Sequence, residues 1–187
     1  MPHDPEGSHY NNGCSEGGYV TICRPKSMKP SREHRKPSRL KDFSYRGYYR
    51  YFITLRSQSF KHHFVNNEVI AKVIDILKST AEQEGFLVWA YCFMPNHVHL
   101  LVEGRNSNAD MKHFVFLFKQ KTAYWFKSTY GIKLWAPNYY EHVLRNDEAT
   151  VTVARYIIQN PIRKGMVDNC SSYPYSGSFE LEDICSL

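Results

Sequence analysis

The chain has 187 residues, which is enough for one well-buried domain and short for two. Its 24 Lys and Arg against 18 Asp and Glu give a net charge of +6, which suits a polyanionic partner. No stretch approaches roughly 18 consecutive apolar residues, so the sequence excludes a membrane-spanning helix. The N-terminus shows no apolar leader of the kind that directs secretion.

The cysteines are odd in number, widely scattered and never spaced as CxxC. They are Cys14, Cys23, Cys92, Cys170 and Cys185. This pattern is typical of neither a disulfide framework nor a zinc knuckle. We therefore expect unpaired cysteines and a reducing, cytoplasmic location.

Residues 1–45 differ in composition from the rest, because they are rich in Gly, Pro, Ser and Asn and show no hydrophobic period. Positions 24–41 hold 8 of the 24 basic residues. This segment is either an arm that follows phosphates or a solvated, disordered tail; alternatively, translation starts at Met28. We expect a disordered extension over 1–45, a folded domain over 46–167 and a C-terminal tail over 168–187.

The folded part alternates strand and helix patterns. Alternating side chains over 51–56 predict a first strand. Asn66 or Asn67 caps a helix that Gly85 closes, and 86–94 is an apolar strand. Pro95 and Asn96 form a turn before a strand over 97–103.

A second helix is expected from Asn108 to Gly131, a strand over 139–145, and a third helix from Asp147 that stops before Pro161. The order β-α-β-β-α-β plus a helix predicts an α+β, ferredoxin-like fold with an antiparallel sheet. Both crossover helices then cover one face, because such crossovers are right-handed. The other face is left for the third helix or for a ligand.

Two histidines are separated by one residue on the predicted strand 97–103. Because side chains alternate along a strand, His97 and His99 lie on the same side and Val98 on the other. Two neutral imidazoles placed in this way can bind one divalent ion. A bare HxH also occurs by chance or as a polar sheet face, so it does not establish a metal site.

The third helix carries a tyrosine on its polar side. Val151, Ala154, Ile157 and Ile158 form one apolar face at helical spacing. Tyr156 projects to the opposite side, with Asn160 one turn later. If this side meets the histidine strand, a phenol, two imidazoles and an amide surround one cation. Such a cation polarises a phosphate for attack by the phenol oxygen.

Several ordered motifs resemble those of REP-associated tyrosine transposases, which belong to the single-tyrosine HUH transposase superfamily. Segment 91–102 (YCFMPNHVHLLV) is similar to their metal motif, and 156–165 (YIIQNPIRKG) to their catalytic-helix signature. Between them, 118–123 (FKQKTA), 134–135 (LW) and 139–146 (YYEHVLRN) resemble the middle of these proteins, and 173–176 (YPYS) their C-terminal motif.

The resemblance implies the HUH endonuclease fold, with Tyr156 as the nucleophile and His97 and His99 as metal ligands. The third ligand corresponds to Asn160, with Gln159 as the alternative, and the metal is Mg²⁺ or Mn²⁺. Such enzymes cleave and rejoin single-stranded DNA beside hairpins through a 5′-phosphotyrosine. REP-associated members act on chromosomal palindromes, which implies a monomer associated with the nucleoid, with neither a membrane nor a small-molecule substrate.

Basic residues near these motifs are the expected DNA contacts, since phosphates dominate such interfaces. They are Arg56, Lys119, Lys121, Arg145, Arg155, Arg163 and Lys164. A structural role is an equal alternative for each of them. For the whole protein, the alternative is a domesticated hairpin-binding protein without catalysis.

Overall fold

The computed structural model describes residues 43–145, 149–182 and 184–186. The N-terminal extension expected over 1–45 lies almost wholly outside these residues, so the basic arm, the disordered tail and the start at Met28 all stay predictions. Asp147, the expected cap of the third helix, also lies outside the described residues.

The centre of the fold is an antiparallel sheet. Its strands are β1 (Arg50–Ser57), β2 (Phe86–Met94), β3 (His97–Gly104), β4 (Trp135–Val143) and β5 (Ser176–Gly177), in the order β4-β1-β3-β2-β5. Each neighbouring pair is antiparallel. The first four strands and their two crossover helices confirm the predicted ferredoxin-like α+β core.

Helices α1 (Asn67–Glu84) and α2 (Met111–Tyr130) begin and end largely at the residues that the sequence indicates. The Asn66 side chain accepts hydrogen bonds at the start of α1, and Gly85 ends it in the left-handed conformation (φ 70°). The prediction of Asn108 as the start of α2 is wrong. Asp110 caps this helix by accepting from the backbone of Lys112 and His113.

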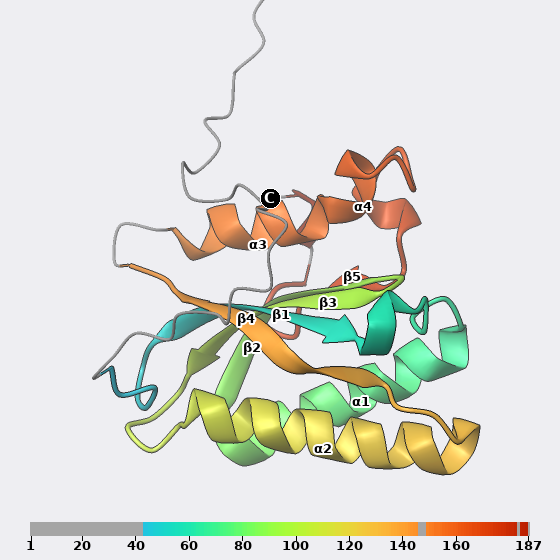
Figure 1. The fold of residues 1–187 in the computed structure, drawn as a ribbon. Coiled ribbons are helices and arrows are strands. Elements are labelled where there is room, and N and C mark those ends of the chain that lie inside the picture. Colours follow the sequence, from blue (N-terminus) through green and yellow to red (C-terminus); the bar gives the residue numbers. More distant parts are fainter. Residues whose placement is uncertain (1–42, 146–148, 183, 187) are drawn as a thin grey trace, which may run out of the picture. The chain divides into compact units, whose positions relative to one another are not determined.

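One face of the sheet is covered by α1 and α2, as predicted (Figure 1). Val98, Leu100 and Val102 of β3 point into this layer and are fully buried against residues of both helices. Within the described parts of the chain, no helix is both long and apolar enough to cross a membrane.

The opposite face is covered by α3 (Thr150–Ile158) and the short α4 (Asn160–Arg163) (Figure 1). Ala154, Ile157 and Ile158 pack on Phe52 and Leu101, as the apolar period predicts. Val151, expected on the same face, is instead exposed in the first turn of α3. α3 stops before Pro161, but the chain continues as α4, in which that proline occupies the first turn.

Strand β4 starts at Trp135, four residues before the predicted strand. The indole Nε1 of Trp135 donates to Thr122 Oγ1 of α2 at 2.7 Å, and both residues are buried. This contact fixes the start of β4 against α2. The early start of β4 depends on a contact with another element, so the alternation of side chains over 139–145 could not indicate it and predicted a strand that is too short.

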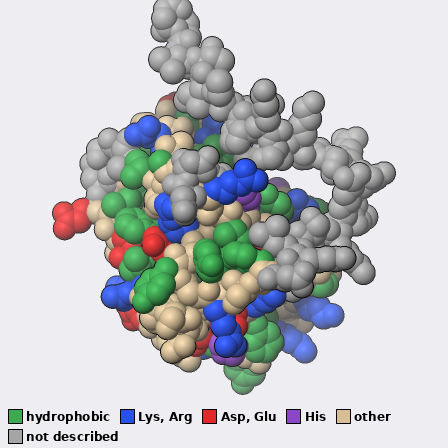
Figure 2. Space-filling view, turned by 90° about the vertical axis from the view of Figure 1, so that its left-hand side faces the viewer, with side chains coloured by type: hydrophobic (Ala, Val, Ile, Leu, Met, Phe, Trp, Pro, Cys, Tyr) green, Lys and Arg blue, Asp and Glu red, His purple; other side chains and the backbone are tan. Residues whose placement is uncertain are grey.

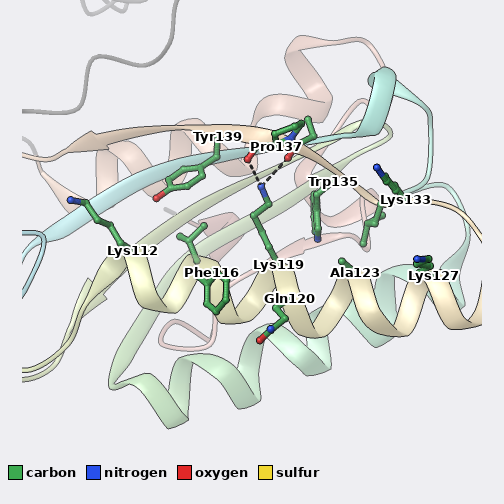
Figure 3. A pocket seen from close by; sticks show the side chains of 13 residues that line it. Lys112, Phe116, Lys119, Gln120, Ala123, Lys127, Lys133, Trp135, Pro137 and Tyr139 are labelled. Carbon is green, nitrogen blue, oxygen red and sulfur yellow. Dashed lines mark hydrogen bonds between the residues drawn. The ribbon is translucent and has the colours of Figure 1, made fainter.

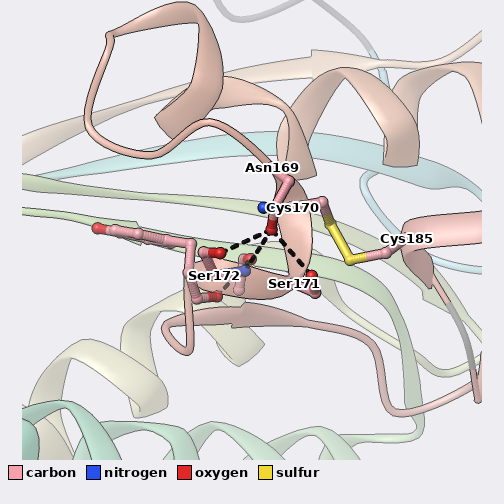
Figure 4. The surroundings of a disulfide bond; sticks show 7 residues. Asn169, Cys170, Ser171, Ser172 and Cys185 are labelled. Carbon is pink, nitrogen blue, oxygen red and sulfur yellow. Dashed lines mark hydrogen bonds between the residues drawn. A yellow bond between two sulfur atoms is a disulfide. The ribbon is translucent and has the colours of Figure 1, made fainter.

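The segment expected to be a tail, 168–187, is in its described part joined to the folded domain. Tyr173 donates from its phenol to the Phe93 carbonyl at 2.7 Å, and Ser176 pairs with Cys92 in the sheet. The expectation of unpaired cysteines is also wrong here, since Cys170 and Cys185 form a disulfide (Figure 4). Asn169, next to it, accepts hydrogen bonds from Ser171 and Ser172 (Figure 4).

Candidate active site

The two histidines of β3 lie side by side on the α3 face of the sheet. Their Nε2 atoms are 3.1 Å apart. The Nδ1 of His97 lies 2.7 Å from Asn96 Oδ1, and the Nδ1 of His99 lies 2.9 Å from Thr54 Oγ1. Both rings are therefore oriented through Nδ1, and both Nε2 atoms converge.

Both imidazoles are held in the neutral form that metal binding requires. Burial, followed by the charges of Arg56 and Lys164, lowers the pKa of His97 to about 4. Burial, followed by His97 and the charges of Arg163 and Arg56, lowers the pKa of His99 to about 3. The charges of Arg56, Arg163 and Lys164 thus act on the pair.

The Nε2 pair fits a divalent cation. Two ligands about 2.1 Å from an ion, at a right angle as in octahedral coordination, are about 3.0 Å apart. The observed 3.1 Å matches this separation. The described ranges contain no group of three His, Cys, Asp or Glu side chains that could hold a metal ion.

Tyr156 is on the outer side of α3, opposite its apolar face, and its side chain is 36% exposed. The Arg163 guanidinium lies 4.0 Å from the centre of its ring and also donates to the Tyr156 carbonyl. Arg163 also acts electrostatically on His99 and Cys92. Arg163 thus contacts the tyrosine and acts on the histidine face through its charge, while Tyr156 itself is on the outer side of the helix.

Asn160 departs from its expected position on the exposed side of the helix, because it is only 8% exposed. Its amide nitrogen donates to the carbonyls of Ile157 (3.0 Å) and Tyr156 (3.3 Å). The amide oxygen is then the atom that a cation would use. Gln159, the alternative ligand, is half-buried at the junction between α3 and α4.

The predicted DNA contacts do not all lie near the histidines. Arg56, Arg163 and Lys164 lie near the histidines, as their effects on the pKa values show. Arg155 is exposed on α3, and Arg145 is exposed just after β4. On the side of the molecule shown in Figure 2, basic side chains are scattered among hydrophobic and acidic ones. DNA contact by each of these residues stays a prediction.

Lys119 and Lys121 are placed on the other side of the sheet. The amine of Lys119 donates to the carbonyls of Ala136 (2.8 Å) and Pro137 (2.9 Å) within a groove of about 550 Å³ between α2 and β4 (Figure 3). The amine of Lys121 donates to Gln83 of α1 at 2.8 Å. The structure therefore does not bring these two lysines to the histidines and gives each an internal partner.

Sequence reasoning missed Thr54 and Asn96, which orient the imidazoles. Thr54 pairs with His99 across β1 and β3, and this register is set by the whole sheet. No local pattern around Thr54 indicates it. Asn96 could have been found, because an amide next to a candidate ligand is a typical outer-shell partner.

The part of the chain that carries the histidines and Tyr156 matches a known family. Residues 47–160 match the family described as "Transposase IS200 like". The chain belongs to this family, which confirms the transposase class that the motifs indicate.

Two Haemophilus influenzae proteins are similar to the chain. One, classed with the REP-associated tyrosine transposases, is 27% identical over 149 residues, which cover 73% of this chain and 82% of that protein. The other, of unassigned function, is 24% identical over 160 residues, which cover 69% of this chain and 89% of that protein.

The fold also matches a solved structure, that of the REP-associated tyrosine transposase bound to a REP hairpin. The TM-score is 0.63 at 19% identity, covering 79% of this chain and 90% of the other. This likeness confirms the fold.

Proposed function

We propose that the protein cleaves and rejoins single-stranded DNA beside a hairpin, with Tyr156 as the nucleophile. The observation that carries this proposal is the convergent Nε2 pair of His97 and His99 on the face covered by the helix of Tyr156. Arg163 connects the two, since it contacts the tyrosine ring and acts electrostatically on His99.

The proposed reaction exchanges one phosphodiester for another. The Tyr156 oxygen attacks the phosphorus, the bond to the 3′ oxygen breaks, and a 5′-phosphotyrosine and a free 3′-OH result. The phenol loses its proton, and the departing oxygen gains one. Attack by a 3′-OH on the phosphotyrosine rejoins the strand without an external energy source, because one ester replaces another.

His97, His99 and the Asn160 amide, with Gln159 as the alternative, would hold Mg²⁺ or Mn²⁺. When bound, this cation supplies positive charge at the scissile phosphate. The neutral imidazoles and the amide add no negative charge of their own, so the site favours an anionic phosphate. Arg56, Arg163 and Lys164 extend this preference along the strand.

Hairpin DNA is the proposed partner, because the matching solved structure is that of a transposase bound to a REP hairpin. A chromosomal palindrome as target would associate the protein with the nucleoid. We propose a monomer, as the resemblance to REP-associated members implies.

The test is formation of a covalent adduct on a denaturing gel. Purified protein is mixed with labelled single-stranded hairpins from the flanks of its own gene, with Mg²⁺, with Mn²⁺ or with EDTA. We expect a metal-dependent adduct that Tyr156→Phe abolishes. The matched control is Tyr140→Phe, because Tyr140 is also an exposed tyrosine but lies on β4. This variant should keep the adduct.

An adduct that persists in Tyr156→Phe would overturn the assignment of the nucleophile. A hairpin gel shift without adduct in either metal would favour the alternative, a non-catalytic hairpin-binding protein.

A further inference from the structure

The turn after β1 has a backbone conformation that side chains rarely adopt. Two consecutive residues other than glycine, Ser59 and Phe60, both have a φ of 54°. Such residues persist only where their surroundings hold them, and they concentrate at functional sites. The turn is therefore a place to look for a role in binding.

Hydrogen bonds fix this turn to the turn that precedes the histidines. Ser57 N donates to Asn96 O at 3.0 Å, and Phe64 N donates to Pro95 O at 3.0 Å. Gln58 N donates to Leu134 O at 2.8 Å, which ties the same segment to the start of β4. The turn is thus held at the end of the sheet where His97 lies.

This anchored turn presents an aromatic ring and a cation together. The ring of Phe60 is 57% exposed, and the Arg56 guanidinium lies 5.4 Å from its centre. Arg56 is paired with His97 across β1 and β3, and its charge lowers the pKa of both histidines. An exposed ring with a cation beside it is the combination that binds an unpaired base and its phosphate.

We propose that Phe60 is a base-stacking residue for the DNA strand at the active site. One unpaired base next to the scissile phosphate stacks on the ring of Phe60, while Arg56 contacts the adjoining phosphate. This inference rests on the proposed function and adds a binding residue to it. It also gives the left-handed backbone a reason, because that conformation keeps the ring out of the core and beside Arg56.

The test compares variants in binding of a labelled hairpin that carries an unpaired flank, measured by fluorescence anisotropy in EDTA. Phe60→Gly removes the ring and suits the left-handed backbone, so its melting temperature should equal or exceed that of the wild type. Its affinity should fall by about 5- to 150-fold, the range of one lost stacking contact. Phe60→Trp should keep the affinity.

Phe116→Ala is the matched control, because Phe116 is also 57% exposed but lies on α2, on the other side of the sheet. It should leave binding unchanged. An abasic scan of the flank locates the contact: at one position, loss of the base should make the wild type and Phe60→Gly bind equally.

A Phe60→Gly protein that binds every flank as the wild type does would overturn the inference. An equal loss on a hairpin without a flank would also overturn it, because no unpaired base is then involved. If such results accompany a normal Tyr156 adduct, only this inference fails. If the wild type forms no adduct and binds no single strand, the proposed function fails and this inference falls with it.

Discussion

The tautomer of His99 is coupled to the direction of its hydrogen bond with Thr54. Asn96 Oδ1 accepts from Nδ1 of His97, so the lone pair of His97 is at Nε2. The Thr54 hydroxyl can either donate to the Nδ1 of His99 or accept from it. Only when it accepts does His99 also present a lone pair at Nε2. Both lone pairs are needed to bind one cation.

Replacing Thr54 by Val removes this hydrogen bond at nearly constant volume. We expect Mn²⁺ affinity to fall by about 10- to 100-fold, the usual cost of losing an outer-shell partner. Isothermal titration calorimetry measures it. Thr129→Val is the control, because the Thr129 hydroxyl donates to the Trp125 carbonyl within α2, on the other side of the sheet. Unchanged Mn²⁺ affinity in Thr54→Val would show that Thr54 does not orient a ligand.

Arg163 has a planar contact with Tyr156 that lysine cannot reproduce. Arg163→Lys keeps the charge but loses stacking on the ring at 4.0 Å. A cation–π contact is worth up to about 2 kcal/mol, so we expect adduct formation at saturating DNA to slow by about tenfold. Quenched time courses measure this rate.

Arg155→Lys, on the exposed side of α3, is the matched control and should react normally. If Arg163→Lys instead weakens DNA binding and leaves the rate constant at saturation unchanged, Arg163 is a DNA contact without a positioning role.

At the scale of elements, local sequence patterns predicted the structure correctly wherever a helix cap or the alternation of side chains determines it. Asn66, Gly85 and Gly131 bound the helices, and alternation placed His97 and His99 on one face. Sequence patterns failed where contacts between residues far apart in the sequence determine the structure. Trp135 starts β4 early because Thr122 accepts its indole N–H. Asn160 is buried because the chain continues into α4, which begins at Asn160, instead of leaving the helix for solvent.

Lys119 is predicted as a DNA contact from its position in the sequence, but its partners in the structure belong to another element. Its role can be tested. Burial lowers the pKa of Lys119, whose amine joins α2 to two carbonyls of β4. Lys119→Met leaves these carbonyls without their charged donor, so we expect the free energy of unfolding to fall by about 1.5–3 kcal/mol. Urea unfolding measures this loss.

Lys127→Met is the control, since Lys127 lines the same groove near the end of α2. We expect it to change stability little. If Lys119→Met is as stable as the wild type but lowers the salt dependence of DNA binding by about one unit of slope, Lys119 is the DNA contact that its sequence position indicates.

At the scale of the whole molecule, the C-terminal residues complete the layer between the sheet and α3, on the face of the candidate active site. Tyr173 and Tyr175 pack against the layer beneath α3, and β5 extends the sheet beside β2. Ile184 also contacts this layer. The Cys170–Cys185 disulfide joins the two ends of this segment over a sequence separation of 15. The segment thus supports the helix that carries Tyr156.

Loss of the disulfide should destabilise the oxidised protein as a whole. By the chain-entropy relation, a loop of this length is worth about 3 kcal/mol, so Cys170→Ser and Cys185→Ser should each lower the free energy of unfolding by about that amount. Urea unfolding with and without reductant tests this. Reductant should bring the wild type to the level of the variants and leave the variants unchanged.

Cys92→Ala separates the disulfide from cysteine packing. Burial raises the pKa of the Cys92 thiol to about 12, so this thiol stays protonated and unreactive. Because Cys92 is fully buried, Cys92→Ala should destabilise the protein equally with and without reductant. If the wild type shows no response to reductant and peptide mapping finds no Cys170–Cys185 link, the C-terminal segment is held without a disulfide, by contacts that include the Tyr173 hydrogen bond, β5 and apolar packing.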